Sequence, residues 1–268
     1  MNIFEALIMG IVQGLTEFLP VSSSGHLLIL EKLTGLSESD GGAFFTTMVH
    51  IATLVAVIIV YRKTIWGIIR HPINKTLLYL IIATIPTVII ALLYKTVLKS
   101  FDEMASSGGI LGISFIITAI LLTLCDYVST RGKKRDMEKM TVKDALIIGG
   151  MQCIGTLPGV SRSGSTISGA LFSGLNKSAA ADFSFLMSIP AILGSAVLEG
   201  KDAIDAGTIG VPVLSLIVGM IAAGVTGYFA VKFMIKLIKN KKLYGFAIYT
   251  AALGIIIMID QYVTHLVF

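Results

Sequence analysis

A few ionisable side chains lie inside strongly apolar stretches of this 268-residue chain. Five of them stand out, namely Glu17, His26, His50, Arg162 and Asp182. The chain is 55% hydrophobic and only 14% charged, so we expect lipid rather than water to surround most of it. Charged groups are costly to hold at membrane depth, and these residues are therefore candidates for chemistry.

Gln13 and Glu17 are four residues apart, so on a helix they project from one face about one turn apart. A carboxylate and an amide oxygen suit a hard divalent cation, which takes oxygen ligands and often shares them with a phosphate. The alternative is that Glu17 serves only as the ion-pair partner of Arg162. Both interpretations stay open at this point.

A hydroxyl-rich stretch follows the proline of the first loop, at an expected helix break. Its members are Ser22, Ser23, Ser24, Gly25 and His26. Hydroxyl groups and free N–H groups at a helix N-terminus form an anion site, and glycine lets the backbone approach the anion closely. A serine run is also a common cap, so the functional interpretation depends on the adjoining histidine and on a second copy of the stretch.

That second copy, LPGVSRSGST at residues 157–166, again precedes an expected helix and includes an arginine. The arginine side chain is always charged, and its planar fork of donors matches phosphate oxygens. A structural salt bridge from Arg162 to Glu17 or Asp182 is the alternative. The predicted phosphate ligands of this loop are Ser161, Arg162, Ser163, Gly164 and Thr166. In the first loop they are Ser22, Ser24 and Gly25.

Together the loops contain what phosphoryl transfer needs, namely a nucleophile, a base and a positive charge. His26 is a candidate base or nucleophile, and Ser23 is the alternative nucleophile. Glu17 is predicted to be an orienting base or metal ligand, with Gln13 as the second metal ligand. Arg162 is predicted to stabilise the developing negative charge. His50 is interpreted as a polar packing residue of a spanning helix, with a supporting role at the site as the alternative.

The elements that must position these residues are apolar runs long enough to cross a bilayer. A duplication organises them, because residues 13–26 are echoed by residues 152–165 at an offset of 138 to 140. It predicts repeats at 1–130 and 140–268 within one integrated membrane domain. The expected spans are 44–61, 76–94 and 108–126 in the first repeat, and 178–198, 211–231 and 245–263 in the second.

Positive charge sets the expected orientation. Residues 62–75, 131–143 and 232–242 are basic and are predicted to be cytoplasmic loops. Residues 144–174 must then enter and leave from the cytoplasm, and residues 2–30 from outside. The predicted fold is an all-α polytopic membrane protein with two inverted-topology repeats, six transmembrane helices and two re-entrant helical hairpins. A fully spanning segment at residues 2–30 is the alternative.

The motifs QGLTEFLPVSSSGH (residues 13–26) and LPGVSRSGST (residues 157–166) resemble the two signature motifs of the undecaprenyl-diphosphatase family, which is associated with bacitracin resistance. The resemblance covers essentially the whole chain. It implies removal of the terminal phosphate from undecaprenyl pyrophosphate at the outer face of the bacterial plasma membrane, which recycles the lipid carrier for cell-wall synthesis. It also implies a divalent metal, Mg²⁺ or Ca²⁺.

By position, the resemblance places the acidic pair at residues 13 and 17, the nucleophile candidates at Ser23 and His26, and phosphate ligands at Ser161, Arg162 and Thr166. Many family members have glutamate where this chain has Gln13. An amide can coordinate a metal but cannot act as a base, so Glu17 is expected to carry more of the chemistry.

A lipid-phosphate flippase or secondary transporter is the competing function, because inverted repeats with opposed re-entrant hairpins also build transporters. The expected partners are the lipid pyrophosphate substrate and membrane lipid, with no nucleic acid. Whether the chain forms a homodimer is left open.

Overall fold

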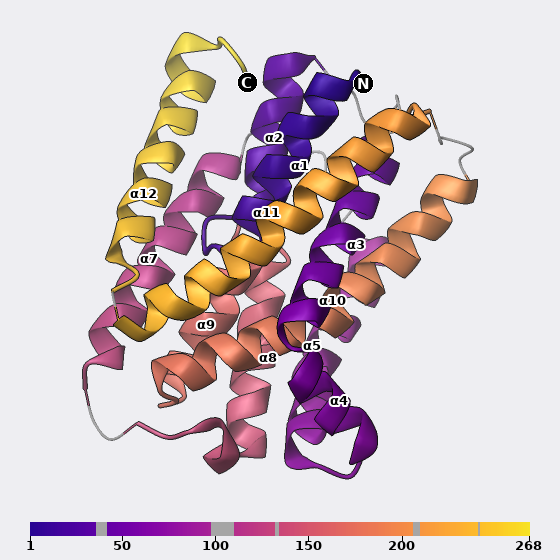
Figure 1. The fold of residues 1–268 in the computed structure, drawn as a ribbon. Helices are drawn as coiled ribbons and strands as arrows, with labels where there is room; N and C mark the ends of the chain where they lie inside the picture. The colour runs from indigo at the N-terminus through magenta and orange to yellow at the C-terminus, as the bar shows by residue number, and fades with distance from the viewer. Residues whose placement is uncertain (36–41, 98–109, 132–133, 206–209, 241) are drawn as a thin grey trace.

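The computed structural model describes residues 1–35, 42–97, 110–131, 134–205, 210–240 and 242–268. These residues form a bundle of helices (Figure 1), and within them no strand occurs beyond one isolated bridge between Arg135 and Leu175. The first half contains α1 (Ile3–Phe18), α2 (Ser23–Thr34), α3 (Gly42–Val60), α4 (Arg62–Arg70), α5 (Lys75–Val97) and α7 (Leu111–Ser129). The second half contains η2 (Met137–Lys139), α8 (Val142–Gly155), α9 (Arg162–Phe172), α10 (Lys177–Asp205), α11 (Val213–Asn240), α12 (Tyr244–Ile259) and η3 (Asp260–Thr264).

Six of these helices are long and apolar enough to cross a membrane, as predicted. Large apolar side chains on their surfaces are exposed, among them Ile85 (49%), Ile217 (47%) and Ile256 (61%), as expected for helices that face lipid tails. The spans are Gly42–Val60, Lys75–Leu93, Leu111–Ser129, Lys177–Leu198, Val213–Lys239 and Tyr244–Thr264.

Two of the basic segments expected to be loops are largely helical. Helix α11 continues to Asn240 and so includes most of residues 232–242, and α4 occupies most of residues 62–75. Lysine and arginine are good helix formers, and their charge is favourable near a helix C-terminus. For residues 232–239 the prediction of a loop was wrong, because they continue a spanning helix and charge had been taken as its end, whereas α4 lies between two spans. Figure 1 shows α4 at the end of the bundle away from both chain termini.

Each motif lies at a break between two consecutive helices, as predicted. Residues 19–22 separate α1 from α2, and residues 156–161 separate α8 from α9. Each break contains a proline, which disfavours a continuous helix. The longer arm precedes the break and the shorter arm follows it in both halves.

The first arm of each pair packs closely on a spanning helix of the other half of the chain. The contact is made in each arm by a glycine, and these two glycines are 139 residues apart in the sequence. A Cβ atom at Gly10 of α1 would lie 2.3 Å from the carbonyl oxygen of Gly219 in α11. The equivalent Gly149 of α8 would place its Cβ atom 2.4 Å from the carbonyl oxygen of Ala83 in α5. Glycine therefore allows backbone contact at both crossings, as is common between membrane helices. These crossings hold the two arms that carry the motifs against the spanning helices α11 and α5.

The start of α8 is held by an ion pair outside the six spans. Arg135 donates to both oxygens of Asp144, at 2.9 and 2.8 Å, and Thr141 forms a capping box with the same carboxylate. Burial alone would raise the pKa of the Asp144 carboxyl, but hydrogen bonds from Arg135 and Thr141 outweigh burial and hold that pKa below its usual value. The carboxylate thus anchors the arm that leads to the second motif.

Candidate active site

The two motifs share one capping hydrogen bond at the start of the shorter arms, although the cap residue has a positive φ (73°) in the first motif and a negative φ (−72°) in the second. Ser22 is the N-cap of α2, and its hydroxyl group accepts a hydrogen bond from the N–H of Gly25 at 3.3 Å. Ser161 is the N-cap of α9, and its hydroxyl group accepts from the N–H of Gly164 at 3.0 Å. Serine is a preferred cap because its oxygen satisfies an otherwise unpaired N–H group. Two helix N-termini are thereby formed by equivalent residues.

The two loops lie against each other. Ser163 Oγ donates to the carbonyl oxygen of Leu19 at 3.1 Å, and the N–H of Gly159 lies 3.4 Å from Ser24 Oγ. Gly159 has a φ of +81°, and a Cβ atom there would lie 2.6 Å from the side chain of Leu111 in α7. Glycine is therefore required at this turn both by conformation and by space. The structure brings the two motifs into one site, as the sequence predicts.

Glu17 lies at the centre of the polar cluster and is only 5% exposed. One carboxylate oxygen, Oε1, forms an ion pair with Arg162 of the second motif. The other, Oε2, accepts hydrogen bonds from Ser23 Oγ at 2.6 Å and from Gln13 Nε2 at 3.0 Å. His50 Nε2 of α3 lies 3.5 Å from that same oxygen. A buried carboxylate surrounded by donors is stabilised as the charged form.

The alternative partner of Arg162, Asp182, is engaged elsewhere. Its carboxylate accepts hydrogen bonds from Tyr61 Oη at 2.8 Å and from Ser178 Oγ at 3.3 Å. Of the two carboxylates that the sequence offers to Arg162, Glu17 is therefore the one the fold selects.

His26 belongs to the same loop as Ser23 but contacts different groups. Its Nδ1 atom lies 2.6 Å from the carbonyl oxygen of Ser22, and its Nε2 atom lies 2.6 Å from the hydroxyl oxygen of Tyr249 in α12. A carbonyl oxygen only accepts, so Nδ1 carries the hydrogen and, in the neutral ring, Nε2 accepts from Tyr249. The ring stacks on Tyr249, with centroids 5.7 Å apart, and meets Phe115 edge-on. Within the described residues, His26 has no hydrogen bond to Glu17 or Arg162.

The predicted phosphate ligands differ in how accessible they are. Ser24 is exposed, whereas Ser23 and Arg162 are half-buried, so these three side chains can meet a ligand. Thr166 is completely buried. Its hydroxyl group donates to the carbonyl oxygen of Arg162 at 2.9 Å and accepts from Ser184 Oγ at 2.6 Å. Thr166 thus braces the turn that carries the arginine. Direct phosphate binding by Thr166 stays a prediction.

One feature of Gln13 suits it to act as a ligand of a hard cation. Its Nε2 group donates to Glu17, which leaves the Oε1 atom buried without a hydrogen-bond partner. A buried acceptor without a donor is unfavourable, and a cation would satisfy it. No cluster of three His, Cys, Asp or Glu side chains suited to a metal occurs among the described residues. The donors therefore fit a metal only if a substrate supplies further oxygens, as phosphates commonly do for Mg²⁺.

Of two further residues at the site, the sequence predicted one only as an alternative and the other not at all. His50 was interpreted mainly as a packing residue, yet it lies beside Glu17. Its position in an apolar span was the signal that favoured its alternative, supporting role. Tyr249 gave no signal, because a tyrosine in a spanning helix is common and only the packing of α12 brings it to His26.

These features define a class: a multi-pass helical membrane protein with one carboxylate–arginine–serine cluster where two broken helices meet. Comparison with known proteins narrows the class. Residues 6–256 match the family described as bacitracin resistance protein BacA, and the chain belongs to that family.

Curated relatives cover nearly the full length of both chains. A protein of Carboxydothermus hydrogenoformans named undecaprenyl-diphosphatase is 46% identical over 263 residues, which is 97% of this chain and 98% of the relative. Undecaprenyl-diphosphatase 4 of Bacillus thuringiensis is 44% identical over 99% of both chains. An undecaprenyl-diphosphatase of Bacteroides fragilis is 43% identical over 97% of this chain and 98% of the relative.

Proposed function

We propose that the protein hydrolyses undecaprenyl pyrophosphate to undecaprenyl phosphate and inorganic phosphate. The observation that carries this proposal is the contact of both motifs with one carboxylate, Glu17, through Ser23 and Arg162. Membership of the BacA family and the names of its curated relatives support the same reaction. The product is the lipid carrier that cell-wall synthesis uses again, and destroying the pyrophosphate form would confer resistance to bacitracin.

In the proposed mechanism Ser23 is the nucleophile. Its hydroxyl group already donates to Glu17 at 2.6 Å, which is the geometry of a nucleophile beside its base. Attack on the terminal phosphorus would break the bond to the bridging oxygen, release undecaprenyl phosphate and pass the serine proton to Glu17. Glu17 would give that proton up to the released lipid phosphate or to water. Water would then hydrolyse the phosphoserine, with Glu17 taking a proton from the attacking water and returning it to Ser23 Oγ as inorganic phosphate leaves. His26 is the alternative nucleophile, and it would first have to leave Tyr249.

Arg162 is proposed to bind the terminal phosphate and to stabilise the charge that develops on it. A guanidinium can share its donors between the Glu17 carboxylate and phosphate oxygens. Ser24 and the free N–H groups at the starts of α2 and α9 would hold the remaining oxygens. His50 would keep the carboxylate oriented through its contact at 3.5 Å.

A divalent cation, Mg²⁺ or Ca²⁺, is part of the proposal. Gln13 Oε1 and the Glu17 carboxylate would hold it together with pyrophosphate oxygens. Such a cation supplies positive charge that neutralises the transferring phosphoryl group. Equal phosphate release in a metal buffer and in excess chelator would remove the cation from the proposal.

We also propose the inverted-repeat topology, with two re-entrant hairpins and an active site that opens to the extracytoplasmic face of the plasma membrane. The duplication at 138 to 140 residues and the equivalent crossings at Gly10 and Gly149 support it. Cysteine introduced at residue 2 should react with an impermeant thiol reagent added from outside the cell. Reaction only from the cytoplasmic side would overturn this topology.

The function is tested with purified protein and undecaprenyl pyrophosphate in detergent micelles, by measuring released phosphate. Arg162→Ala should lower turnover by at least about 10²-fold, since removing one charge-stabilising donor typically costs that much. Arg70→Ala is the matched control, because Arg70 is exposed on α4 and stacks only on Trp66 among described aromatic rings. Substrate-dependent lipid translocation without phosphate release would instead indicate a flippase or transporter.

A further inference from the structure

The side chain of His50 presents a nitrogen lone pair to the Glu17 carboxylate. Its Nδ1 atom lies 2.7 Å from the carbonyl oxygen of Thr46, one turn earlier in α3. Because a carbonyl oxygen only accepts, Nδ1 carries the hydrogen, and in the neutral ring Nε2 is left as an acceptor. That nitrogen lies 3.5 Å from Glu17 Oε2. Two acceptors that face each other repel unless a proton or a cation lies between them.

The distance between these two atoms suits a shared metal ion better than a shared proton. A charge-assisted N–H···O hydrogen bond is about 2.7 to 2.9 Å long, so 3.5 Å is too long for an imidazolium group that donates to Glu17. Two ligands that each lie about 2.1 Å from one metal ion are about 3.0 Å apart at an octahedral ion and about 3.4 Å apart at a tetrahedral one. The spacing of His50 Nε2 and Glu17 Oε2 therefore agrees with that of two ligands of one ion.

The hydrogen bond at Nδ1 is also the one that a metal-binding histidine needs. Such a histidine usually donates its other ring N–H group to a carbonyl or carboxylate oxygen, which fixes the ring and makes the free nitrogen a better ligand. The backbone of Thr46 does this for His50. His26 has a similar hydrogen bond at Nδ1, but its Nε2 atom is engaged with the hydroxyl group of Tyr249. Of these two histidines, His50 is therefore the one oriented as a metal ligand.

Gln13 offers a third donor atom beside the other two. Its Oε1 atom is buried without a hydrogen-bond partner, while its Nε2 group donates to the same oxygen of Glu17 at 3.0 Å. We propose that His50 Nε2, Glu17 Oε2 and Gln13 Oε1 are three ligands of one divalent cation, with phosphate oxygens of the substrate as the others. This inference rests on the proposed function, because it assigns one more ligand to the cation of that reaction.

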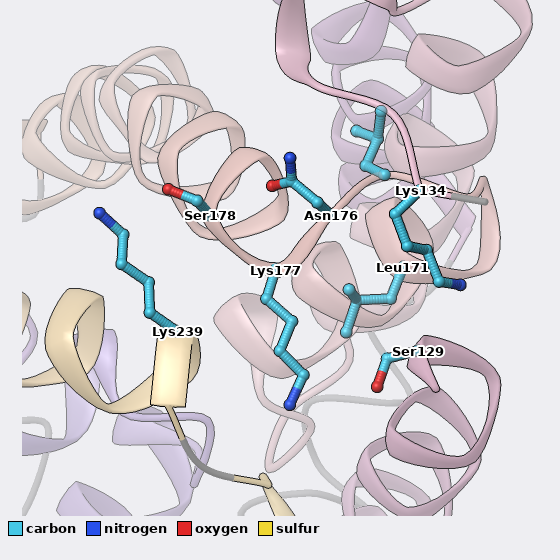
Figure 2. A pocket seen from close by; sticks show the side chains of 8 residues that line it. Ser129, Lys134, Leu171, Asn176, Lys177, Ser178 and Lys239 are labelled. Atoms are coloured by element: carbon cyan, nitrogen blue, oxygen red, sulfur yellow. The ribbon is translucent and has the colours of Figure 1, made fainter. Parts of the chain in front are cut away.

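A polar pocket elsewhere in the described residues is unsuited to a cation. It lies beside Leu171, at the opposite end of α9 from the second motif, and Lys134, Lys177 and Lys239 line it (Figure 2). Their ammonium groups repel a divalent ion. The cation is therefore expected at the motifs, where the carboxylate and the two lone pairs lie.

A nitrogen ligand bears on which ion the site prefers. Ca²⁺ and Mg²⁺ take oxygen ligands, whereas imidazole also suits first-row transition ions. A site with one nitrogen and two oxygen ligands should therefore bind Mn²⁺ more tightly than Ca²⁺. Mn²⁺ is also paramagnetic, so it can report on its own ligands.

The test records the electron spin echo envelope modulation of Mn²⁺ bound to the purified protein, with and without undecaprenyl phosphate. A directly bound imidazole nitrogen modulates this echo. The proteins compared are the wild type, His50→Gln, and the controls His26→Gln and His71→Gln, the last at an exposed position at the end of α4. The wild type and both controls should show the nitrogen modulation, and His50→Gln should lose it. Without lipid, His50→Gln should bind Mn²⁺ at least about tenfold more weakly.

Nitrogen modulation that persists in His50→Gln, or that is missing from the wild type, would overturn the proposal and leave His50 as a neighbour of Glu17 only. Loss of phosphate release with unchanged modulation would instead refute the proposed function and leave the metal site standing. Thermal unfolding checks the fold of each variant. If His50→Gln does not fold, ¹⁵N-labelled histidine in His26→Gln replaces it: the modulation should change to that of ¹⁵N, and an unchanged modulation would overturn the proposal.

Discussion

Replacing Glu17 by glutamine tests whether this carboxylate is a base or only an ion-pair partner. The substitution keeps the volume and one oxygen but removes the charge and the site that accepts a proton. Loss of a general base typically lowers turnover by about 10² to 10⁴-fold, which corresponds to about 3 to 5 kcal/mol in the activation barrier. We expect Glu17→Gln to fall in that range.

Gln13→Ala is the informative comparison because Gln13 contacts the same oxygen. It removes one hydrogen bond to a charged group, worth about 1.5 to 3 kcal/mol at most, while Ser23 and Arg162 continue to hold the carboxylate. Only part of that energy should appear in the barrier, so we expect turnover to fall about tenfold. The assay is phosphate release from undecaprenyl pyrophosphate in detergent, with kcat and KM determined separately.

Loss of stability has to be separated from loss of chemistry. Glu17→Gln leaves the Arg162 guanidinium, whose side chain is 16% exposed, without its charge partner, and breaking a buried pair costs about 3 to 5 kcal/mol. The comparison is therefore repeated in the Arg162→Ala background, where no pair remains to be broken. A base should still lower turnover there by at least about tenfold. No further loss in that background, or equal losses for Gln13→Ala and Glu17→Gln, would refute the reasoning.

Three further outcomes are expected. Tyr249→Phe should leave phosphate release within about threefold, whereas Ser23→Ala should lower it at least about 10²-fold, because the serine contacts the central carboxylate; the reverse ranking would favour the histidine as nucleophile. Gly14→Ala should cost about 1 to 3 kcal/mol in thermal unfolding, because its Cβ atom would lie 2.5 Å from a carbonyl oxygen of α11, while Gly150→Ala, with open space around it, should not. The pKa of the Asp144 carboxyl is lower in the folded protein than in the unfolded chain. The stability that this carboxylate contributes to the fold is therefore present above the unfolded-state pKa, near pH 4, and is lost as the pH falls below that value. The melting temperature of Asp144→Asn should accordingly fall less than that of the wild type between pH 6 and pH 3.

The spans were predictable because hydropathy alone decides them. A run of about 18 apolar residues has few alternatives to crossing a membrane, and the structure has helices at all six expected places. Where helices end was less predictable. Lysine is a good helix former, and the lysines near the end of α11 continue the helix to Asn240. Charge in the sequence therefore did not mark where this helix ends.

The contacts of the site were predictable only where the chain repeats itself. Glu17 and Arg162 were candidates for a pair because the duplication brings the two motifs together. The neighbours of His50 and Tyr249 depend instead on the rotation of α3 and α12 about their axes. Both helices are apolar over most of their surface, and no hydrophobic stripe in the sequence defines which side faces the protein.

Comparison of the two motifs shows how their contributions to the described site differ. At an offset of 139 residues, Gln13 corresponds to Gln152, and both are buried with an Oε1 atom that has no hydrogen-bond partner. Ser23 corresponds to Arg162, and these two side chains contact the two oxygens of Glu17. The residue equivalent to Glu17 is a threonine, so the second half keeps the scaffold without the acid. A pore that alternates between two equal states has no need of that asymmetry, whereas a reaction needs its nucleophile, base and charge clamp at one phosphorus atom.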